Sequence, residues 1–333
     1  MINIKNAILH IIDTNNFINI NSSQNIDLTD GGLLEYISKH IEKTLRDNSA
    51  NEGTVGCSSL FFNECKAYNS GVIDFVKFSS GICDAYAQEI FKSDKKQALD
   101  FLMCEFSMNE KTYIGFLLLP NNTCYTHQVI QEDGAVCNKL LKFYAVLPAI
   151  TQKIHGYALV NLADNRVRYN DMRRFIDGCD KHVIQDVIMN CEKEISSKEA
   201  LAVVKNAVDD IAQKGGKNSA TAIAKAKVFL SENAENSEHI DTDELSYVIF
   251  PDSEELMEAF KQEIREKGVP EVINVRQDYA LREGKKHKIK TDTGIEITVP
   301  AEFFNNRDYI EFKNNVDGTI SIAIKNIGKI MNK

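Results

Sequence analysis

The sequence of 333 residues lacks any hydrophobic run long enough to cross a membrane. Its longest apolar stretch lies at residues 113–120, whereas a membrane-spanning helix needs about 20 apolar residues. Residues 1–16 contain neither a charged leader nor an uninterrupted apolar stretch of signal-peptide length. We therefore expect a cytoplasmic protein with no export signal and no membrane partner.

Clustered cysteines are also absent. The 8 cysteines are scattered singly along the chain, without a CxxC or a tight Cys/His cluster that could hold zinc. Most lie inside apolar segments such as residues 102–104, where a reduced thiol behaves as a small hydrophobic side chain. The pattern predicts reduced structural cysteines and no metal site.

The short motifs of common enzyme classes are missing. There is no GxGxxG, GxxxxGK[ST], HExxH or GxSxG, so we expect no cofactor and no enzyme. Glu283, Gly284 and Lys285, with Glu271 or Asp278 upstream, loosely resemble the acid-and-lysine arrangement of metal-dependent nucleases. Among 48 acidic residues such a pattern arises easily by chance, so a nucleic-acid-processing enzyme stays a minor alternative.

Positive charge is scarce and unevenly placed. The net charge is −9, and residues 196–268 hold 9 Lys and Arg against 15 Asp and Glu. Residues 269–333 reverse the balance, with 11 basic against 9 acidic residues. An acidic chain is not attracted as a whole to nucleic acid, so any such contact must come from a local basic patch.

A chain of this length exceeds the size at which one hydrophobic core usually stops growing. Apolar residues at 4–12 and 17–20 predict a buried hairpin, and Asp30 predicts the N-cap of an amphipathic helix. Alternating patterns predict further strands at the following positions: 99–106, 112–119, 126–131, 135–143 and 157–162. These features indicate an α+β N-terminal domain, residues 1–170, with an antiparallel sheet and packed helices.

The pattern turns helical from Asp171. Ser196 and Glu199 have the spacing of a capping box, and Ser253 opens a further helix that stops near Gly268. Residues 171–268 are therefore expected to form a helical segment. Residues 269–333 are predicted to form a β-rich basic region, with hairpins at 286–299 and 309–325. An alternative division joins 171–333 into one domain.

The densest basic run spans residues 282–290 and contains Arg282, Lys285, Lys286, Lys288 and Lys290. As a strand, it would place the lysines at 286, 288 and 290 on one face, about 6–7 Å apart, close to the phosphate spacing of a nucleic-acid strand. We therefore interpret them as candidate DNA contacts. The alternative is a solvated edge strand that its lysines protect from aggregation.

A second basic group follows the first domain and contains Arg166, Arg168, Arg173 and Arg174. These arginines are weaker candidates for DNA contact. Aspartates at 164, 171 and 177 are interspersed among them, which favours surface salt bridges over a phosphate site.

Three segments resemble the bacterial 37 kDa nucleoid-associated protein family. They are the opening residues 4–13 (IKNAILHIID), the junction at 172–178 (MRRFIDG) and the tail at 290–300 (KTDTGIEITVP). The later runs at 309–313 and 317–322 continue the likeness, so it spans essentially the whole chain. These motifs are apolar and structural, and they carry no set of DNA-contacting residues.

The resemblance implies a cytoplasmic, nucleoid-associated protein that binds double-stranded DNA without a cofactor. On this reading the basic residues contact phosphates with little sequence preference. The alternative is a protein-interaction module that a chromosome-associated partner recruits to the nucleoid, which the negative net charge favours. Other nucleoid proteins are then expected partners, and a symmetric homodimer would double the basic surface.

Overall fold

The computed structural model of the chain describes residues 2–132, 135–275, 277–290, 292–300, 303, 306, 308–315 and 319–329. Side chains are described in these ranges except at positions 132, 278, 285–290, 314 and 320. The chain divides into two compact units, Met1–Glu194 and Ile195–Lys333. Within the described ranges, no helix combines the length and the apolar character needed to cross a membrane.

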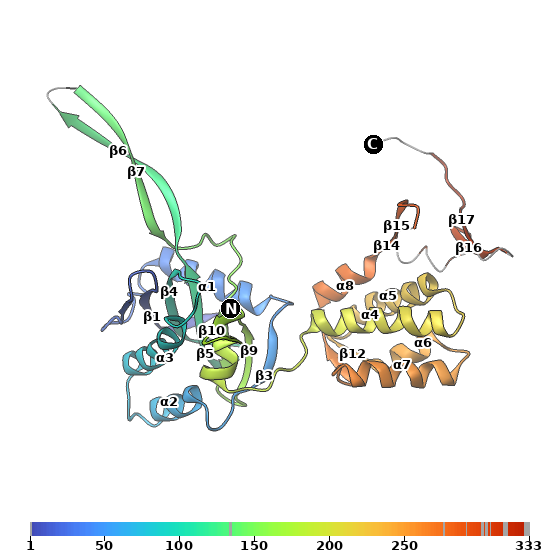
Figure 1. Cartoon of the computed structure of the whole chain (residues 1–333), viewed down its shortest axis with the longest axis horizontal. Helices are drawn as coiled ribbons and strands as arrows, with labels where there is room; N and C mark the ends of the chain where they lie inside the picture. Colours follow the sequence, from blue (N-terminus) through green and yellow to red (C-terminus); the bar gives the residue numbers. More distant parts are fainter. Residues whose placement is uncertain are drawn as a thin grey trace. The chain divides into compact units, whose positions relative to one another are not determined.

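A seven-stranded antiparallel sheet forms the centre of the N-terminal unit, with the strand order β2-β1-β4-β5-β8-β9-β3 (Figure 1). Its strands are β1 (Asn3–Asp13), β2 (Ile18–Ile20), β3 (Asn51–Thr54), β4 (Ala98–Met108), β5 (Lys111–Pro120), β8 (Tyr157–Asn161) and β9 (Arg166–Asn170). The predicted α+β class, with an N-terminal antiparallel sheet and packed helices, is confirmed.

Successive side chains of a strand point to opposite faces of the sheet. Those of the central strands are apolar on both faces, so helices cover both faces. The helices are α1 (Gly31–Leu45), α2 (Leu60–Asn69) and α3 (Phe75–Ile90). Phe101 packs with α2 and α3 in one core cluster, whereas its neighbour Leu102 packs with α1 in another. The predicted N-cap at Asp30 is confirmed, since its carboxylate accepts hydrogen bonds from the backbone N–H groups of Gly32 and Leu33.

The first predicted hairpin forms, but only one of its strands is buried. β1 lies inside the sheet between β2 and β4. β2 is a three-residue edge strand. Phe17, which precedes it, is 70% exposed, and Ile20, its last residue, is 54% exposed. An edge strand has a neighbour on one side only, so its apolar side chains are less completely covered.

A long two-stranded ribbon projects from the N-terminal unit (Figure 1). It consists of β6 (Asn122–Glu132) and β7 (Ala135–Val146), which pair with each other and with no other strand in the described part of the chain. Both strands were predicted from their alternation. We call residues 122–146 the arm.

The segment after β9 differs from the helical prediction. It contains the short hairpin β10 (Arg174–Ile176) and β11 (Cys179–Lys181), followed by the π-helix η1 (Val183–Met189). Asp177 and Gly178 have positive φ values of 51° and 81°, which suits the tight turn between the two strands. Ile176, Val183 and Ile188 are buried in the N-terminal core, so the compact unit extends to Glu194, past the expected boundary at residue 170.

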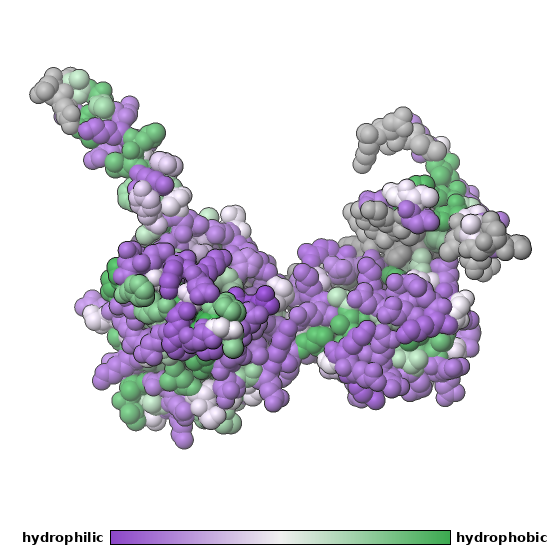
Figure 2. Space-filling model, in the orientation of Figure 1, coloured by the Kyte–Doolittle hydropathy of each residue, from purple (hydrophilic) through white to green (hydrophobic). Residues whose placement is uncertain are grey.

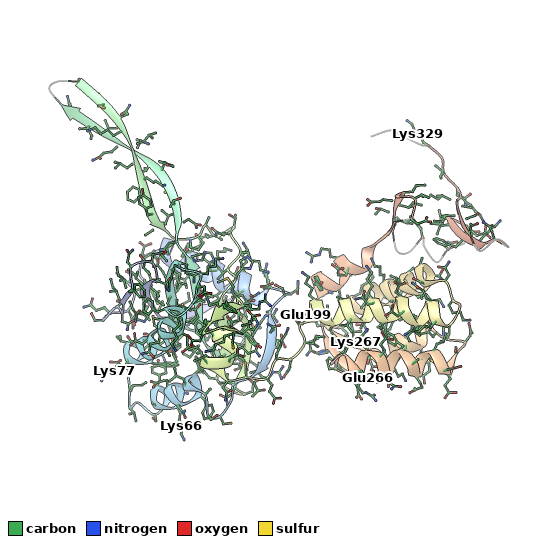
Figure 3. The ribbon with its side chains drawn as sticks, viewed as in Figure 1. Lys66, Lys77, Glu199, Glu266, Lys267 and Lys329 are labelled. Atoms are coloured by element: carbon green, nitrogen blue, oxygen red, sulfur yellow. The ribbon has the colours of Figure 1, made fainter. Side chains whose placement is uncertain are left out.

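The C-terminal unit begins as a set of packed helices. Its elements are α4 (Ser197–Lys214), α5 (Ser219–Ala234), β12 (His239–Asp241), α6 (Thr242–Ile249), α7 (Glu254–Glu266) and β13 (Val272–Asn274). The predicted capping box is confirmed: Ser196 accepts from the backbone N–H of Glu199, and the Glu199 carboxylate accepts from the backbone N–H of Ser196. Figure 3 labels Glu199 at the start of α4. Ser253 caps α7 as predicted.

The last part of the chain adds α8 (Gln277–Lys285) and two hairpins. The hairpins pair β14 (Lys286–Lys290) with β15 (Glu296–Pro300), and β16 (Ile310–Asn314) with β17 (Ile320–Ile324). Both hairpins were predicted, whereas α8 was not. A small apolar cluster joins Ala224 of α5 to Val299 and Ile310, which packs residues of both hairpins against that helix.

Candidate nucleic-acid interface

The basic run at 282–290 is divided between a helix and a strand. Arg282 and Lys285 belong to α8, and the strand begins only at Lys286. The register of β14 sets Lys286, Lys288 and Lys290 opposite Pro300, Thr298 and Glu296. The backbone thus has the extended form that a row of lysines requires. The side chains of residues 285–290 lie outside the described part of the chain.

Arg282 is exposed on α8 and is held by an aromatic ring. Its guanidinium lies 5.1 Å from the centroid of the Tyr279 ring, one helical turn earlier. Tyr279 itself is buried in the core of the C-terminal unit. The cation–π contact therefore fixes the arginine at the surface without neutralising it.

Two lysines that the sequence analysis did not single out lie close to α8. Lys205 is exposed on α4, and Lys227 is half-buried on α5. Burial and the neighbouring charge of Lys205 lower the pKa of Lys227, whereas the Glu283 carboxylate raises it. The three side chains also line a small cleft of about 50 Å³ whose other walls are mainly apolar. Cations from α4 and α5 thus gather beside Glu283 of α8.

Gly284 explains how α8 comes so close to α5. A Cβ at this position would lie 2.8 Å from the backbone oxygen of Lys227 and 2.9 Å from the backbone nitrogen of Ser231. Only glycine permits such a close approach of the two backbones. The basic strand β14 begins two residues later, so this contact positions its start beside Lys227.

Electrostatically, this surface suits a polyanion. Lys205 and Lys227 repel each other, and a phosphate group beside them would relieve that repulsion. Glu283 offsets part of the positive charge. We call Lys205, Lys227, Arg282 and residues 285–290 the basic surface.

Two further lysines of the same unit lie beside carboxylates. On α7, Lys261 lies 3.2 Å from an oxygen of Asp243, and Lys267 lies 2.8 Å from an oxygen of Glu263. Figure 3 labels Lys267 beside Glu266 at the end of α7.

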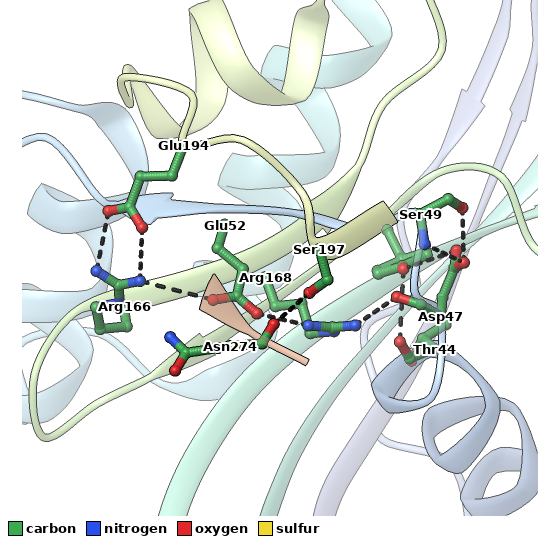
Figure 4. Close-up of polar contacts among 10 residues, drawn as sticks. Thr44, Asp47, Ser49, Glu52, Arg166, Arg168, Glu194, Ser197 and Asn274 are labelled. Atoms are coloured by element: carbon green, nitrogen blue, oxygen red, sulfur yellow. Dashed lines mark hydrogen bonds and ion pairs between the residues drawn. The ribbon is translucent and has the colours of Figure 1, made fainter. Parts of the chain in front are cut away.

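The arginines that follow the first domain are engaged in the fold. Arg166 donates two hydrogen bonds to the Glu194 carboxylate, at 2.9 and 2.8 Å (Figure 4). Arg168 donates to Glu52 at 2.6 Å and to the backbone oxygen of Asp47 (Figure 4). These contacts connect β9 to β3 and to the chain after η1, as the salt-bridge interpretation anticipated.

The next two arginines behave differently from each other. Arg174 is buried and donates to the Tyr86 hydroxyl at 2.9 Å, so it forms part of the core. Arg173 is 69% exposed and lies 3.2 Å from Asp180 across the β10–β11 turn. Arg166, Arg168, Arg173 and Arg174 belong to the N-terminal unit and are partnered there, so the basic surface of the C-terminal unit does not include them.

The titratable side chains of the described residues bear on whether the protein has a metal site or a catalytic site. No group of three or more His, Cys, Asp and Glu side chains there could hold a metal ion. The buried Glu105 carboxylate accepts hydrogen bonds from Lys5, Asn6 and Tyr68, at 2.7 to 2.8 Å. His10 is fully buried: Nδ1 accepts from the backbone N–H of Ser22, and Nε2 lies 3.0 Å from the Ser79 hydroxyl. These contacts have a structural role, as the sequence predicted for His10.

A mixed α+β fold with a cationic surface on one unit has the features of a binding protein. Comparison with known families matches residues 8–332 to the nucleoid-associated protein YejK family. Because the match covers nearly the whole chain, the protein belongs to this family of bacterial nucleoid-associated proteins, which confirms the resemblance seen in the sequence. No curated protein matches the chain.

Proposed function

We propose that this nucleoid-associated protein binds double-stranded DNA directly, through the basic surface of its C-terminal unit and largely without sequence preference. The supporting observation is that Lys205 and Lys227 lie together beside Glu283 of α8, the helix that leads directly into the lysine-rich strand β14. Lysine and arginine contacts to phosphates supply affinity and position the duplex, whereas sequence is read by contacts to base edges. The protein then acts in the nucleoid, within the cytoplasm, and needs no cofactor or catalytic step.

Binding through phosphate contacts should depend strongly on the salt concentration. A chain with a net charge of −9 is repelled by DNA at long range, so binding depends on a few local contacts. Each neutralised phosphate contributes about −0.9 to the slope of log K against log salt concentration. Three strand lysines would account for about −3 of that slope.

The decisive variant changes Lys286, Lys288 and Lys290 together to Glu. We expect affinity for a duplex at low salt to fall at least about 100-fold and the salt slope to flatten by about 3, because each lysine contributes one phosphate contact. Fluorescence anisotropy with labelled duplexes of two unrelated sequences, across a salt series, measures both quantities. Equal affinity for the two sequences is the expected sign of phosphate recognition.

A control variant carries the same change in net charge away from the basic surface. Lys66→Glu, Lys77→Glu and Lys111→Glu alter three exposed lysines of the N-terminal unit, two of which Figure 3 labels. This variant should keep most of its affinity. Equal losses in both variants would assign the effect to overall charge, and an unchanged lysine-strand variant would contradict the role of β14. A parent protein that fails to bind duplex at low salt would rule out direct binding.

The acidic composition of residues 232–244 supports a second candidate function, recruitment to the nucleoid by a protein partner. Six carboxylates in this segment surround the turn between α5 and α6 and would repel DNA. Affinity capture of the tagged chain from a nuclease-treated lysate separates the two functions. Chromosome-associated proteins that stay bound after the DNA is removed would support recruitment, whereas their complete loss would support direct DNA binding.

A further inference from the structure

The arm exposes more apolar surface than a lone hairpin in water ordinarily does. Seven large apolar side chains on it are between 38% and 78% exposed: Tyr125, Val129, Val136, Leu140, Leu141, Phe143 and Tyr144. Figure 2 shows hydrophobic (green) and hydrophilic (purple) residues intermixed along the arm. Isolated two-stranded hairpins are marginally stable in water, and exposed apolar patches of this kind mark interaction sites.

The register of the arm sorts these side chains onto its two faces. Directly paired residues share a face, and the pairs Tyr125↔Lys142, His127↔Leu140 and Val129↔Asn138 define one of them. By strand alternation this face carries five of the seven exposed side chains: Tyr125, Val129, Val136, Leu140 and Tyr144. The Lys142 ammonium lies over the Tyr125 and Tyr144 rings, at 5.8 and 4.9 Å from their centroids. We call this the tyrosine face of the arm.

The arm contacts the N-terminal unit at both of its ends. β6 follows β5 after a single residue, Asn121, whose backbone N–H donates to Ala98 of β4 at 3.1 Å. After the return strand β7, Leu147 packs against the core, and the backbone oxygen of Pro148 accepts a hydrogen bond from the Tyr36 hydroxyl at 2.8 Å. A preorganised element loses less conformational entropy when it binds a partner.

The charge of the arm indicates that its binding partner is not DNA. Residues 122–146 contain two lysines and two acidic residues, so the arm is neutral within a chain of net charge −9. A ribbon that enters a DNA groove needs cations for the phosphates on either side. A neutral apolar surface is instead the part of an acidic protein at which a second acidic copy can approach with the least repulsion.

The available area fits a protein interface. An arm with strands of 11 and 12 residues is about 35 Å long, and the five exposed apolar side chains of its tyrosine face present on the order of 600 Å². In a stable interface each partner buries about 800 Å² on average and about 600 Å² at the lower end of the range. Two identical faces related by a two-fold axis are self-complementary, since each residue meets the same surface on the other copy.

We propose that the arm is a dimerisation element, in which the tyrosine faces of two copies of this chain pack against each other. The dimer brings two basic surfaces into one particle. Formation of the dimer does not depend on DNA binding, so the two proposals can fail separately.

Sedimentation equilibrium of the full chain tests the dimer. The parent should sediment at twice the chain mass of 37.5 kDa. Val129→Glu with Leu140→Glu places like charges in the centre of the tyrosine face and should weaken dimerisation at least about 30-fold, equivalent to about 2 kcal/mol. Because neither residue belongs to a core cluster of the described chain, the variant should keep the thermal unfolding of the N-terminal unit.

A control variant carries two equivalent changes outside the arm, Val72→Glu and Tyr247→Glu, at residues that are 74% and 59% exposed. It should remain dimeric, with the parent's dissociation constant. A parent that is monomeric at tens of micromolar, or an arm variant as dimeric as the parent, would overturn the proposal. An arm variant that stays dimeric and loses affinity for duplex DNA would assign the arm to DNA instead.

Discussion

At the scale of single residues, the two carboxylates of β4, Glu105 and Asp100, are both buried but have opposite pKa shifts. Burial raises the pKa of Glu105, but hydrogen bonds from Lys5, Tyr68 and Asn6 lower it, and the net pKa is below the ordinary value. Asp100, five residues earlier, is 7% exposed, and burial raises its pKa to about 6. A buried carboxylate with such a raised pKa destabilises the folded state whenever it is ionised.

Asp100 therefore gives a pH-dependent prediction. The pKa of Asp100 is higher in the folded protein than the ordinary 3.8. Ionised Asp100 therefore lowers the free energy of unfolding, and this loss of stability is absent below about pH 4 and complete above about pH 6. Asp100→Asn should stabilise the N-terminal unit by about 2 kcal/mol at pH 8 and by little at pH 4. Urea denaturation at both pH values measures the difference. Equal stabilisation at the two pH values would mean that ionisation of Asp100 is not the cause.

The arginines show how a residue type alone can mislead. Arg166, Arg168 and Arg174 lie within nine residues of one another and are basic, yet each makes contacts inside the N-terminal unit. The aspartates between them in the sequence indicated ion pairing. The actual partners Glu52, Glu194 and Tyr86 are distant in the sequence, so only the sheet and its flanking helices could identify them.

At the scale of elements, the packing of α8 on α5 decides where the basic strand lies. Gly284→Ala should destabilise the C-terminal unit by about 1–3 kcal/mol, because the new methyl group would overlap backbone atoms of α5 that cannot move aside. The higher helix propensity of alanine would offset at most about 1 kcal/mol of this. Urea denaturation provides the measurement. We also expect weaker DNA binding, since β14 continues directly from α8.

Gly328 offers a matched control for that substitution. No atom lies within 4 Å of a Cβ built at Gly328, so Gly328→Ala should leave stability within about 0.5 kcal/mol of the parent. If Gly284→Ala proved equally neutral, the close approach of α8 and α5 would not govern the position of the basic strand.

At the scale of the whole molecule, each unit has its own hydrophobic core. The N-terminal unit is built around the two faces of its sheet, and the C-terminal unit around α4, α5 and α7. Calorimetry should therefore resolve two unfolding transitions. At pH 8, Asp100→Asn should raise one transition, and Gly284→Ala should lower the other. A single transition that both substitutions shift would show that the units unfold cooperatively.

Much of the architecture could be predicted from local patterns. The capping residues Asp30, Ser196 and Ser253 were visible because a helix N-terminus leaves backbone donors that nearby side chains satisfy. The strands of the arm and of the C-terminal hairpins followed from alternation. The segment at 174–189 was misread as helical, because its apolar residues serve short strands and a π-helix that pack on the N-terminal core.

By itself, the amino-acid sequence determined the α+β class, the family and the lysine-rich run of the last sixty-five residues, since these depend on composition and short-range pattern. Tertiary structure alone revealed that Lys205 of α4 and Lys227 of α5 lie together beside Glu283 of α8, which packs closely on α5 at Gly284. It also revealed that β6 and β7 have no further strand beside them within the described chain. An alternating pattern is the same in a buried strand and in an exposed arm, and only the neighbours that a strand acquires on folding distinguish the two.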